Sequence, residues 1–287
     1  MPAALSLRKL FSALLTLVAA PFSATARARL RHPRLYRALG RPAPPSFHDY
    51  HTRIAATFAR GPLERVLVVG CNTGHECKAF VELNAARIEG LDVVRNTGQG
   101  FSHARVSYLR SSAECIAVRD DTYDLVYSYA TMEHVPDIEA AFKECARVTR
   151  PGGIIYSLAA PLWNSRYGHH KAGIFAAHPW IHLRLNEDEI IELCQREGID
   201  DPSGREDIAR HVRYMMNPAY FNKTAAARYI DACRSLERVR IIKNELNMES
   251  GHVLDDKQYT ELQKKGYSRR ELLALGHLFI GRKRLES

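Results

Sequence analysis

The sequence predicts an α/β protein with a doubly wound, mostly parallel sheet and helices on both of its faces. One observation is the run Val66–Val69, four branched apolar residues typical of a buried parallel strand, followed directly by a glycine-bearing turn. A second is the alternation of strand-like and helix-like segments over roughly a hundred residues, because strands joined through helices form a parallel sheet covered on both faces.

The turn Gly70–Gly74 leads into a predicted helix, His75–Leu83. A strand, a glycine turn and a helix in this order let backbone N–H groups approach a ligand at the helix N-terminus. About twenty residues further on, a second short strand, Ile88–Asp92, ends in a carboxylate, where a doubly wound fold places an acid on a ribose hydroxyl. We therefore expect a nucleoside-type cofactor.

The elements that follow are predicted from apolar periodicity and from turn and capping residues. Helix 138–148 is amphipathic through Ala141, Phe142 and Cys145. Helix 187–197 has Asn186 as its cap and ends at Gly198. The other predicted elements are a helix over 47–60, strands over 106–109, 125–129 and 154–158, a sharp turn over 150–153, a helix over 224–234 and strands over 239–242 and 277–283.

Charge is concentrated at the start of the chain. The formal net charge is +9, and residues 1–48 contain eight Lys and Arg residues and no acid, so the remainder is nearly neutral. A nearly neutral body lacks the positive excess that phosphate binding favours, which disfavours nucleic acid as a partner. The apolar share of 46% and the charged share of 25% are ordinary for a soluble globular protein.

The basic N-terminal arm combines an apolar helical face over 7–22 with an arginine-rich stretch over 27–41. One apolar anchor plus a polybasic patch favours peripheral membrane contact through residues 5–41. Two alternatives stay open. The arm is either a signal peptide or single membrane anchor, or it is a helix packed on the domain or on a partner. The six cysteines form no CxxC pair and have no zinc-like spacing, so we expect a cytoplasmic protein, located either freely or at the inner face of the membrane.

Six short motifs stand in order and at proper spacing: Gly70-Cys-Asn-Thr-Gly74, Asp92, Ser112-Ala-Glu114, Tyr123-Asp-Leu-Val126, Glu133-His-Val-Pro-Asp137 and Arg150-Pro-Gly-Gly153. Together they resemble the class I S-adenosylmethionine-dependent methyltransferases, in particular the small-molecule branch. The similarity is strong from about Arg65 to Pro161, weaker to about Gly198, and returns at His277–Lys283. It implies a Rossmann-like, seven-stranded, mostly parallel sheet with helices on both faces. The residues outside the family core add an N-terminal helical arm and a C-terminal helical elaboration.

The resemblance and the sequence pattern around it together divide the chain. Residues 1–45 are the basic amphipathic arm and linker, and residues 46–287 are the methyltransferase domain. Within this domain we expect an acceptor-loop insert over 161–184 and a helical elaboration over 205–265.

By the same resemblance, the cofactor is S-adenosyl-L-methionine, and its expected contacts are Gly70, Cys71, Asn72, Gly74, Asp92, Ser112, Ala113, Glu114 and Tyr129. Three positions depart from the family pattern. Val68 replaces an acid, Asn72 replaces the middle glycine of the turn, and Ser112 stands where an aspartate commonly reads the adenine amino group. Asn tolerates left-handed backbone geometry, and a hydroxyl can still accept that hydrogen bond.

The candidate catalytic residues are His134, His169 and His170. An oxygen nucleophile usually needs its proton removed, and His134 just past the fourth strand is expected to face the meeting point of cofactor and acceptor. A helix-capping or structural role is its alternative. The insert holds the other two histidines, together with Trp163, Tyr167 and Trp180, which we expect to stack on a ring of the acceptor.

We expect no metal ion in this insert. His169 and His170 are adjacent, and Pro179 makes a helical pairing of His178 with His182 uncertain. A role in acceptor binding or proton removal is therefore the favoured interpretation, with loop packing as the alternative.

The favoured function is methyl transfer to a small-molecule, glycan or lipid-linked hydroxyl acceptor. Two alternatives are a catalytically silent cofactor-binding scaffold at a membrane, suggested by the three departures, and a nucleic-acid methyltransferase. The nucleic-acid methyltransferase is disfavoured because Ser128–Thr131 stands where enzymes that methylate base amino groups typically carry a Pro-Pro-aromatic motif. The oligomeric state is unknown.

Overall fold

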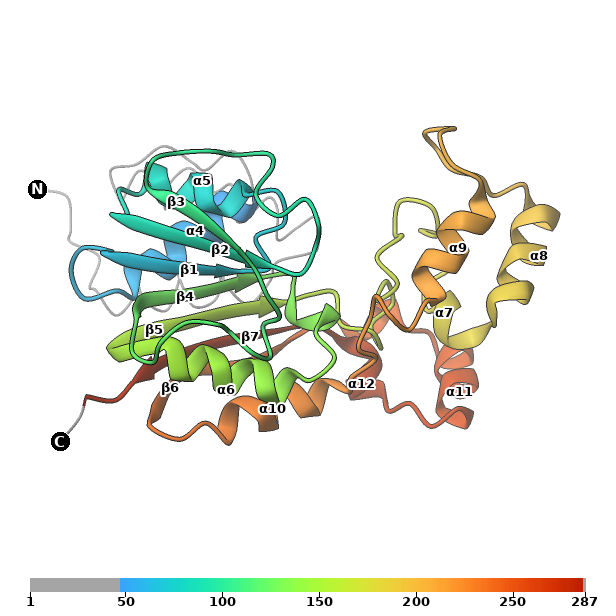
Figure 1. Cartoon of the computed structure of the whole chain (residues 1–287). Helices are drawn as coiled ribbons and strands as arrows, with labels where there is room; N and C mark the ends of the chain where they lie inside the picture. Colours follow the sequence, from blue (N-terminus) through green and yellow to red (C-terminus); the bar gives the residue numbers. More distant parts are fainter. Residues whose placement is uncertain (1–46, 286–287) are drawn as a thin grey trace, which may run out of the picture.

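The computed structural model describes residues 47–285, and the fold is one seven-stranded sheet flanked by helices (Figure 1). The strand order is β3-β2-β1-β4-β5-β7-β6, with β1 to β5 parallel and β7 antiparallel to both of its neighbours. The strands are β1 (Arg65–Val69), β2 (Arg87–Asp92), β3 (Val106–Arg110), β4 (Tyr123–Tyr129), β5 (Thr149–Ala159), β6 (Val239–Met248) and β7 (Ala274–Lys283). The predicted fold class is confirmed.

Helices cover both faces of the sheet (Figure 1). α4 and α5 lie on one face and α6 and α10 on the other. The helices are α4 (Phe47–Thr57), α5 (His75–Glu82), α6 (Ile138–Val148), α7 (Ile181–Arg184), α8 (Glu187–Glu197), α9 (Ile208–Met216), α10 (Ala226–Arg234), α11 (Asp256–Lys264) and α12 (Arg269–Leu273), with 3-10 turns η1 (Met132–His134) and η2 (Gly251–Val253).

The two faces bury separate apolar layers because side chains alternate along each strand. Leu67 and Val69 of β1 pack with Phe142 of α6, whereas Val66 and Val68 pack with the opposite layer under α4 and α5. All four of these β1 residues are at most 1% exposed. The central strand is thus apolar on both sides, which explains its uninterrupted branched run.

A helical lobe, formed by α7, α8, α9 and α11, stands beyond one edge of the sheet (Figure 1). Parallel strands end at a common edge, and the loops after β1, β2 and β4 therefore lie together on the side that faces this lobe. The lobe has two small cores of its own, one around Trp163 and Trp180 and one around Phe175 and Val212.

Two predicted helices are confirmed to the residue. α6 spans Ile138–Val148, and α8 spans Glu187–Glu197. Asn186 forms a capping box with Glu189 at the start of α8, and Gly198 ends it in the left-handed conformation. These signals are local, so no tertiary contact was needed to predict them.

The predicted sharp turn over 150–153 is wrong, because these residues belong to β5. The register between β4 and β5 shifts between Tyr123 and Leu125, and Gly152 has φ +81°. Extra residues in one strand of a pair are accommodated as a bulge, which a glycine at positive φ makes possible. β6 is also longer than predicted, at ten residues.

The arm over 1–45 and its predicted membrane contact lie outside the described residues. Among residues 47–285, no helix is long and apolar enough to cross a membrane.

Candidate active site

The turn after β1 needs glycine at two positions for contacts within the chain. Gly70 has φ +78° and Gly74 has φ +103°. A Cβ on Gly70 would lie 2.0 Å from Oγ1 of Thr131, and a Cβ on Gly74 would lie 2.3 Å from Oη of Tyr108. Both positions therefore combine a backbone conformation that favours glycine with a space that a side chain cannot share.

Asp92, at the end of β2, holds this turn in place. Its Oδ2 accepts a hydrogen bond from the backbone N–H of Asn72 at 2.8 Å, and its Oδ1 accepts from Val93 at 2.7 Å and Val94 at 3.2 Å. Asn72 has φ +45°, so it takes the left-handed geometry expected of the residue that replaces a glycine. The amides of Gly70 and Cys71 donate to the carbonyl of Leu91.

These residues fit a nucleoside cofactor in two respects. A carboxylate oxygen has two lone pairs, so Asp92 can accept a ribose hydroxyl in addition to the backbone N–H groups that orient it. Val93 follows directly and is 59% exposed, which leaves an apolar surface beside the acid. Val93 was not among the predicted site residues, although its position directly after Asp92 could have indicated it.

The loop after β3 carries the residues expected at the adenine. Ser112 Oγ donates to Glu114 Oε2 at 2.9 Å and accepts from the Glu114 amide at 3.1 Å. Glu114 Oε1 accepts from the amide of Asp137 at 2.7 Å, and Ala113 is buried. The Ser112–Glu114 turn is therefore tied to the segment that enters α6.

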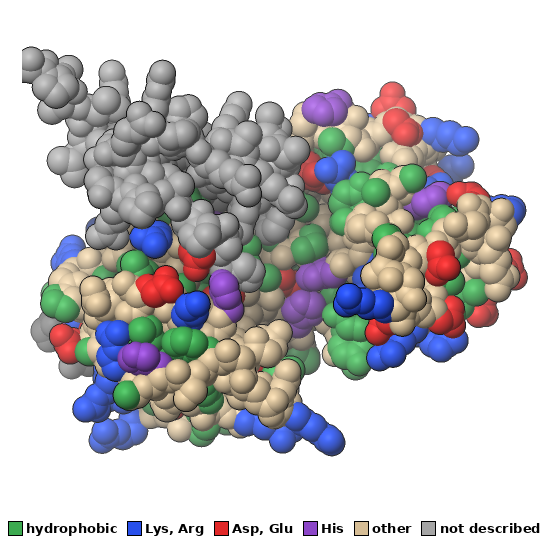
Figure 2. Space-filling view, turned by 90° about the horizontal axis from the view of Figure 1, so that it is seen from above, with side chains coloured by type: hydrophobic (Ala, Val, Ile, Leu, Met, Phe, Trp, Pro, Cys, Tyr) green, Lys and Arg blue, Asp and Glu red, His purple; other side chains and the backbone are tan. Residues whose placement is uncertain are grey.

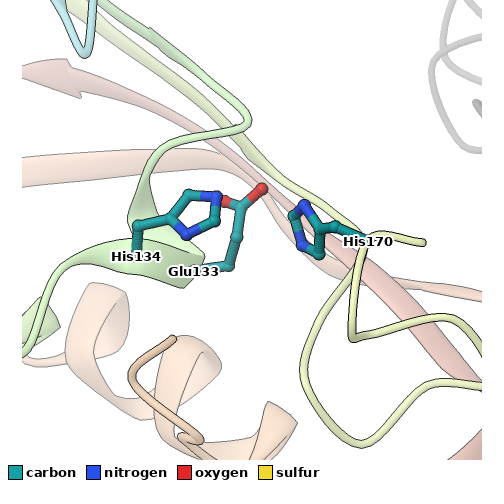
Figure 3. Close-up of side chains that lie close together, drawn as sticks. All are labelled: Glu133, His134 and His170. Atoms are coloured by element: carbon teal, nitrogen blue, oxygen red, sulfur yellow. The ribbon is translucent and has the colours of Figure 1, made fainter. Parts of the chain in front are cut away.

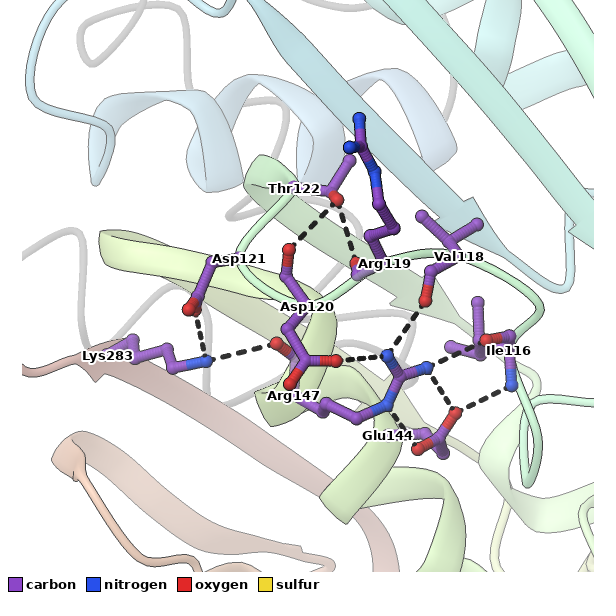
Figure 4. Close-up of polar contacts among 9 residues, drawn as sticks. All are labelled: Ile116, Val118, Arg119, Asp120, Asp121, Thr122, Glu144, Arg147 and Lys283. Atoms are coloured by element: carbon purple, nitrogen blue, oxygen red, sulfur yellow. Dashed lines mark hydrogen bonds and ion pairs between the residues drawn. The ribbon is translucent and has the colours of Figure 1, made fainter.

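Arg147 of α6 anchors the following part of this loop (Figure 4). Its guanidinium donates to the carbonyls of Ile116 and Val118 at 2.7 and 2.8 Å, and it pairs with Asp120 at 2.7 Å. Glu144 completes the cluster by accepting from Arg147 and from the amide of Ile116. Two side chains of α6, Arg147 and Glu144, therefore hold this part of the loop.

β4 ends in an unusual turn that leads into η1. Ala130 has φ +49°, although it is not a glycine, and its amide donates to the carbonyl of Leu158 at 2.8 Å. Such backbone geometry is typical of sites where the surrounding structure imposes it. Tyr129, the last residue of β4 and an expected cofactor contact, is half-buried and packs its ring 5.3 Å from that of His51.

Glu133, His134 and His170 lie close together at this edge of the sheet. Figure 3 shows the Glu133 carboxylate between the two imidazole rings. One ligand atom from each residue lies within 4.8 Å of the others, a spacing that could hold a metal ion. The ring centroids of His134 and His170 are 5.0 Å apart.

Burial shifts the pKa of all three groups. Desolvation raises the pKa of the Glu133 carboxyl to about 8 and lowers the pKa of His170 to about 4. Desolvation also lowers the pKa of His134, and this shift is opposed first by the hydrogen bond with the Tyr220 carbonyl and then by the Asp92 carboxylate. His134 follows β4 and Asp92 ends β2, and these parallel strands end at the same edge of the sheet.

A segment far away in the sequence completes the cluster, and sequence analysis missed it. The carbonyl of Tyr220 lies 2.5 Å from Nδ1 of His134, and Phe221 packs against both His134 and His170. Asn222 donates from its side chain to the carbonyls of Met132 and Val135, on either side of Glu133. No local signal pairs these residues, because the contacts join the segment after α9 to η1.

The insert places only one of its two candidate catalytic histidines at the cluster. His170 faces His134, whereas His169 is fully buried, with its ring against His182 and Phe175. Trp163 and Trp180 are also buried, so neither offers the exposed ring that we expected. Figure 2 shows histidine side chains in the hollow between the sheet and the helical lobe.

Comparisons with known proteins identify the family of the chain. A family profile described as a methyltransferase domain matches residues 67–157. The chain is 30% identical to a ubiquinone biosynthesis O-methyltransferase of Sinorhizobium medicae over 173 residues, which are 56% of this chain and 67% of that protein. The chain belongs to the class I S-adenosylmethionine-dependent methyltransferases. Its cofactor is S-adenosylmethionine.

Other similarities of this methyltransferase are more limited. A ubiquinone biosynthesis O-methyltransferase of Rhizobium rhizogenes is 33% identical over 102 residues, so the match spans 33% of this chain and 41% of that protein. An S-adenosylmethionine-dependent methyltransferase from Mesorhizobium loti has a similar solved structure, with 16% identity, a TM-score of 0.48 and coverage of 82% of this chain and 98% of that one.

Proposed function

We propose that this methyltransferase acts on a hydroxyl oxygen of a small molecule and that the Glu133–His134–His170 cluster handles the hydroxyl proton. The observation that carries the proposal is the position of His134. It lies in η1 directly after β4, at the edge of the sheet where the parallel strand β2 ends in Asp92, and the Tyr220 carbonyl holds its ring. Asp92, which is expected to bind the ribose, and His134, which is expected to accept the proton, thus belong to one site.

The tautomer of His134 supports this role. A carbonyl oxygen can only accept, so Nδ1 of His134 donates to Tyr220 and Nε2 keeps its lone pair. Burial lowers the pKa of His134, which keeps the ring neutral near pH 7 and able to accept a proton. The cofactor supplies a methyl group on a positively charged sulfur, and Asp92 and the turn after β1 would position it.

We propose the same cofactor contacts as the sequence suggested, with Val93 added. Asp92 would accept ribose hydroxyls, and Ser112, Ala113 and Glu114 would line the adenine side, with Val93 against the ring. Gly70, Cys71, Asn72 and Gly74 would shape the turn beneath the methionine part, and Tyr129 would lie beside it. His169 is better explained as packing, because its side chain is buried against His182.

A planar phenolic or quinol-like ring is the acceptor that we favour over a glycan or a lipid-linked sugar. The relatives named for ubiquinone biosynthesis O-methylation support it. Tyr214 and Tyr220 also stack with ring centroids 4.7 Å apart and are 36% and 45% exposed, close to His134. Exposed aromatic faces can stack on a flat ring.

Methyl transfer from isotope-labelled cofactor to a panel of a catechol, a free sugar and a primary amine tests the proposal. We expect label on the catechol oxygen and formation of S-adenosylhomocysteine. Label on the amine alone, or on none of the three, would contradict it. The silent-scaffold alternative predicts cofactor binding without any S-adenosylhomocysteine, so the same assay separates the two.

A further inference from the structure

A cavity of about 340 Å³ lies at the amino-terminal ends of β1, β2 and β3, away from the candidate active site. Arg87 begins β2 and Asp92 ends it, and five residues of a strand span about 16 Å. α6 packs on β4 and β5 and α10 on β6 and β7, whereas residues 111–122, which join β3 to β4, contain no helix (Figure 1). This connection leaves room for a cavity beside β2 and β3.

Three arginines line the cavity at the same level of three adjacent strands. Arg65 pairs with Arg87 in the register of β1 and β2. Arg105 directly precedes Val106, whose partner on β2 is Ile88, so Arg105 is level with Arg87. Adjacent strands are about 4.8 Å apart, and like charges in neighbouring positions repel one another. An anion bound between these side chains would offset the repulsion.

Arg65 and Arg87 have guanidinium groups that are available to a ligand. Both side chains are exposed, and among residues 47–285 neither guanidinium has an ion pair with an acid. Asp124 lies beside Arg65, but it pairs with Arg150 and accepts from the backbone amide of Arg65. The guanidinium carbon of Arg65 lies 5.9 Å from the centroid of the Tyr123 ring, a cation–π contact that orients this side chain.

Arg105 contributes charge but has other partners. Its guanidinium donates to the carbonyl of Ala85 at 2.9 Å and to that of Val81 at 3.1 Å, at the end of α5. We therefore expect Arg105 to strengthen the positive field of the cavity without contacting the ligand itself.

Glu89 adds a hydrogen-bond acceptor to the same cavity. It follows Arg87 by two residues on β2, so both side chains leave the strand on one side. Oη of Tyr123 donates to Oε2 of Glu89 at 2.5 Å, which holds the carboxylate in place. Two carboxylate oxygens offer about four lone pairs, so hydroxyl groups of a ligand can also donate to it. Ser107 on β3 adds an exposed hydroxyl.

We propose that this cavity binds a small phosphate monoester that carries hydroxyl groups, such as a sugar phosphate. Arg65 and Arg87 donate to the phosphate, because a guanidinium matches phosphate oxygens in a bidentate manner. Glu89 accepts from the hydroxyl groups of the sugar. The volume fits such a ligand, since small-molecule sites begin at about 300 Å³.

The cavity shares no residue with the expected cofactor contacts or with the Glu133–His134–His170 cluster. Binding of a sugar phosphate here is therefore independent of the proposed function, and a failure of either one leaves the other intact.

Calorimetric titration of the full chain with ribose 5-phosphate tests the site. Saturating S-adenosylhomocysteine is present, so that Asp92 is not free to take the ribose. We expect one molecule per chain, weaker binding of inorganic phosphate and no measurable binding of ribose. Arg65→Ala and Arg87→Ala should each weaken binding about 10- to 100-fold, which corresponds to the loss of one hydrogen bond to a charged group.

Glu89→Gln separates the two parts of the ligand. Glutamine keeps an oxygen that accepts from Tyr123 but carries no negative charge, so inorganic phosphate should bind at least as tightly as in the wild type. The preference for ribose 5-phosphate over inorganic phosphate should fall, because fewer lone pairs remain for the sugar hydroxyls. An unchanged preference would overturn the part given to Glu89.

Arg240→Ala is the matched control, because Arg240 is an exposed arginine on β6, at the opposite edge of the sheet. It should bind like the wild type, and thermal unfolding followed by circular dichroism confirms that each variant is folded. The site would be overturned by equal affinity in the wild type, Arg65→Ala and Arg87→Ala, or by inorganic phosphate that binds as tightly as ribose 5-phosphate. Binding only in the absence of S-adenosylhomocysteine would also overturn it, since the ligand would then occupy the cofactor site.

Discussion

Nδ1 of His134 donates a 2.5 Å hydrogen bond to the carbonyl of Tyr220, which lies 86 residues later in the chain. This contact fixes the ring at the edge of the sheet and leaves Nε2 directed away from Tyr220. It also brings the segment after α9 to the end of β4. The helical lobe and the sheet therefore share the candidate active site.

Asp92→Asn should weaken cofactor binding by about 10- to 100-fold. Asparagine has one acceptor oxygen where aspartate has two, and one buried hydrogen bond to a charged group contributes about 1.5–3 kcal/mol. Calorimetric titration with S-adenosylhomocysteine measures the change. The exposed Asp200→Asn is the control and should bind normally. Equal affinity in Asp92→Asn would remove Asp92 from the cofactor site.

Gly70→Ala should destabilise the protein by about 1–3 kcal/mol, because it strains a left-handed backbone. The added methyl group also meets Thr131 at 2.0 Å. Urea unfolding gives the free energy. Gly173→Ala is the matched control, since its Cβ meets nothing within 4 Å. A Gly70→Ala protein as stable as Gly173→Ala would show that the turn is not held as described.

Arg147→Ala should lower the free energy of unfolding by about 1–3 kcal/mol, because it removes the guanidinium donor from the carbonyl of Val118 and one of the two donors from the carbonyl of Ile116 (Figure 4). The loop with Ser112 should loosen with it, which hydrogen exchange of residues 111–122 would detect. Arg234→Ala is the control, since Arg234 is exposed and pairs only within α10. Unchanged exchange in the Arg147 variant would argue against anchoring from α6.

Stability should fall in acid, in part through His277. This residue is fully buried, its Nε2 lies 2.7 Å from Asn244 Oδ1, and desolvation lowers its pKa to about 3. The folded pKa is depressed below the unfolded value of 6.5, so the stabilising contribution is present above pH 6.5 and is lost as pH falls below it.

The test compares unfolding free energies at several pH values between the unfolded and folded pKa of His277. Each pH unit in this window removes about 1.4 kcal/mol for one such histidine. His277→Gln keeps a donor toward Asn244 and cannot titrate, so its profile should be shallower by that amount. Identical slopes in the two proteins would mean that His277 is protonated in the fold.

The sequence predicted the sheet and its helices because their signals are local. The apolar run of β1, the amphipathic α6 and the capped α8 each carry their own pattern, and Asp92 stands at a strand end. The bulge in β5 was not predicted, because Arg150–Gly153 has the composition of a turn. Only the pairing with β4 makes this segment part of the strand.

The candidate site was predicted in part. His134 and His170 were both named, but their meeting depends on how the insert folds back over η1. Tyr220 and Phe221 reach the cluster through tertiary packing alone. The two tryptophans were expected to be exposed, yet the lobe buries them because it needs a core of its own.

Turnover of the His134→Asn variant, measured on the acceptor that the wild type methylates best, tests the central claim most directly. The asparagine amide can replace Nδ1 as donor to Tyr220 but has nothing in place of Nε2. The account predicts a fall in kcat of about 10²–10⁴-fold with unchanged cofactor affinity. Turnover equal to that of the wild type would contradict it, because the cluster would then have no part in methyl transfer.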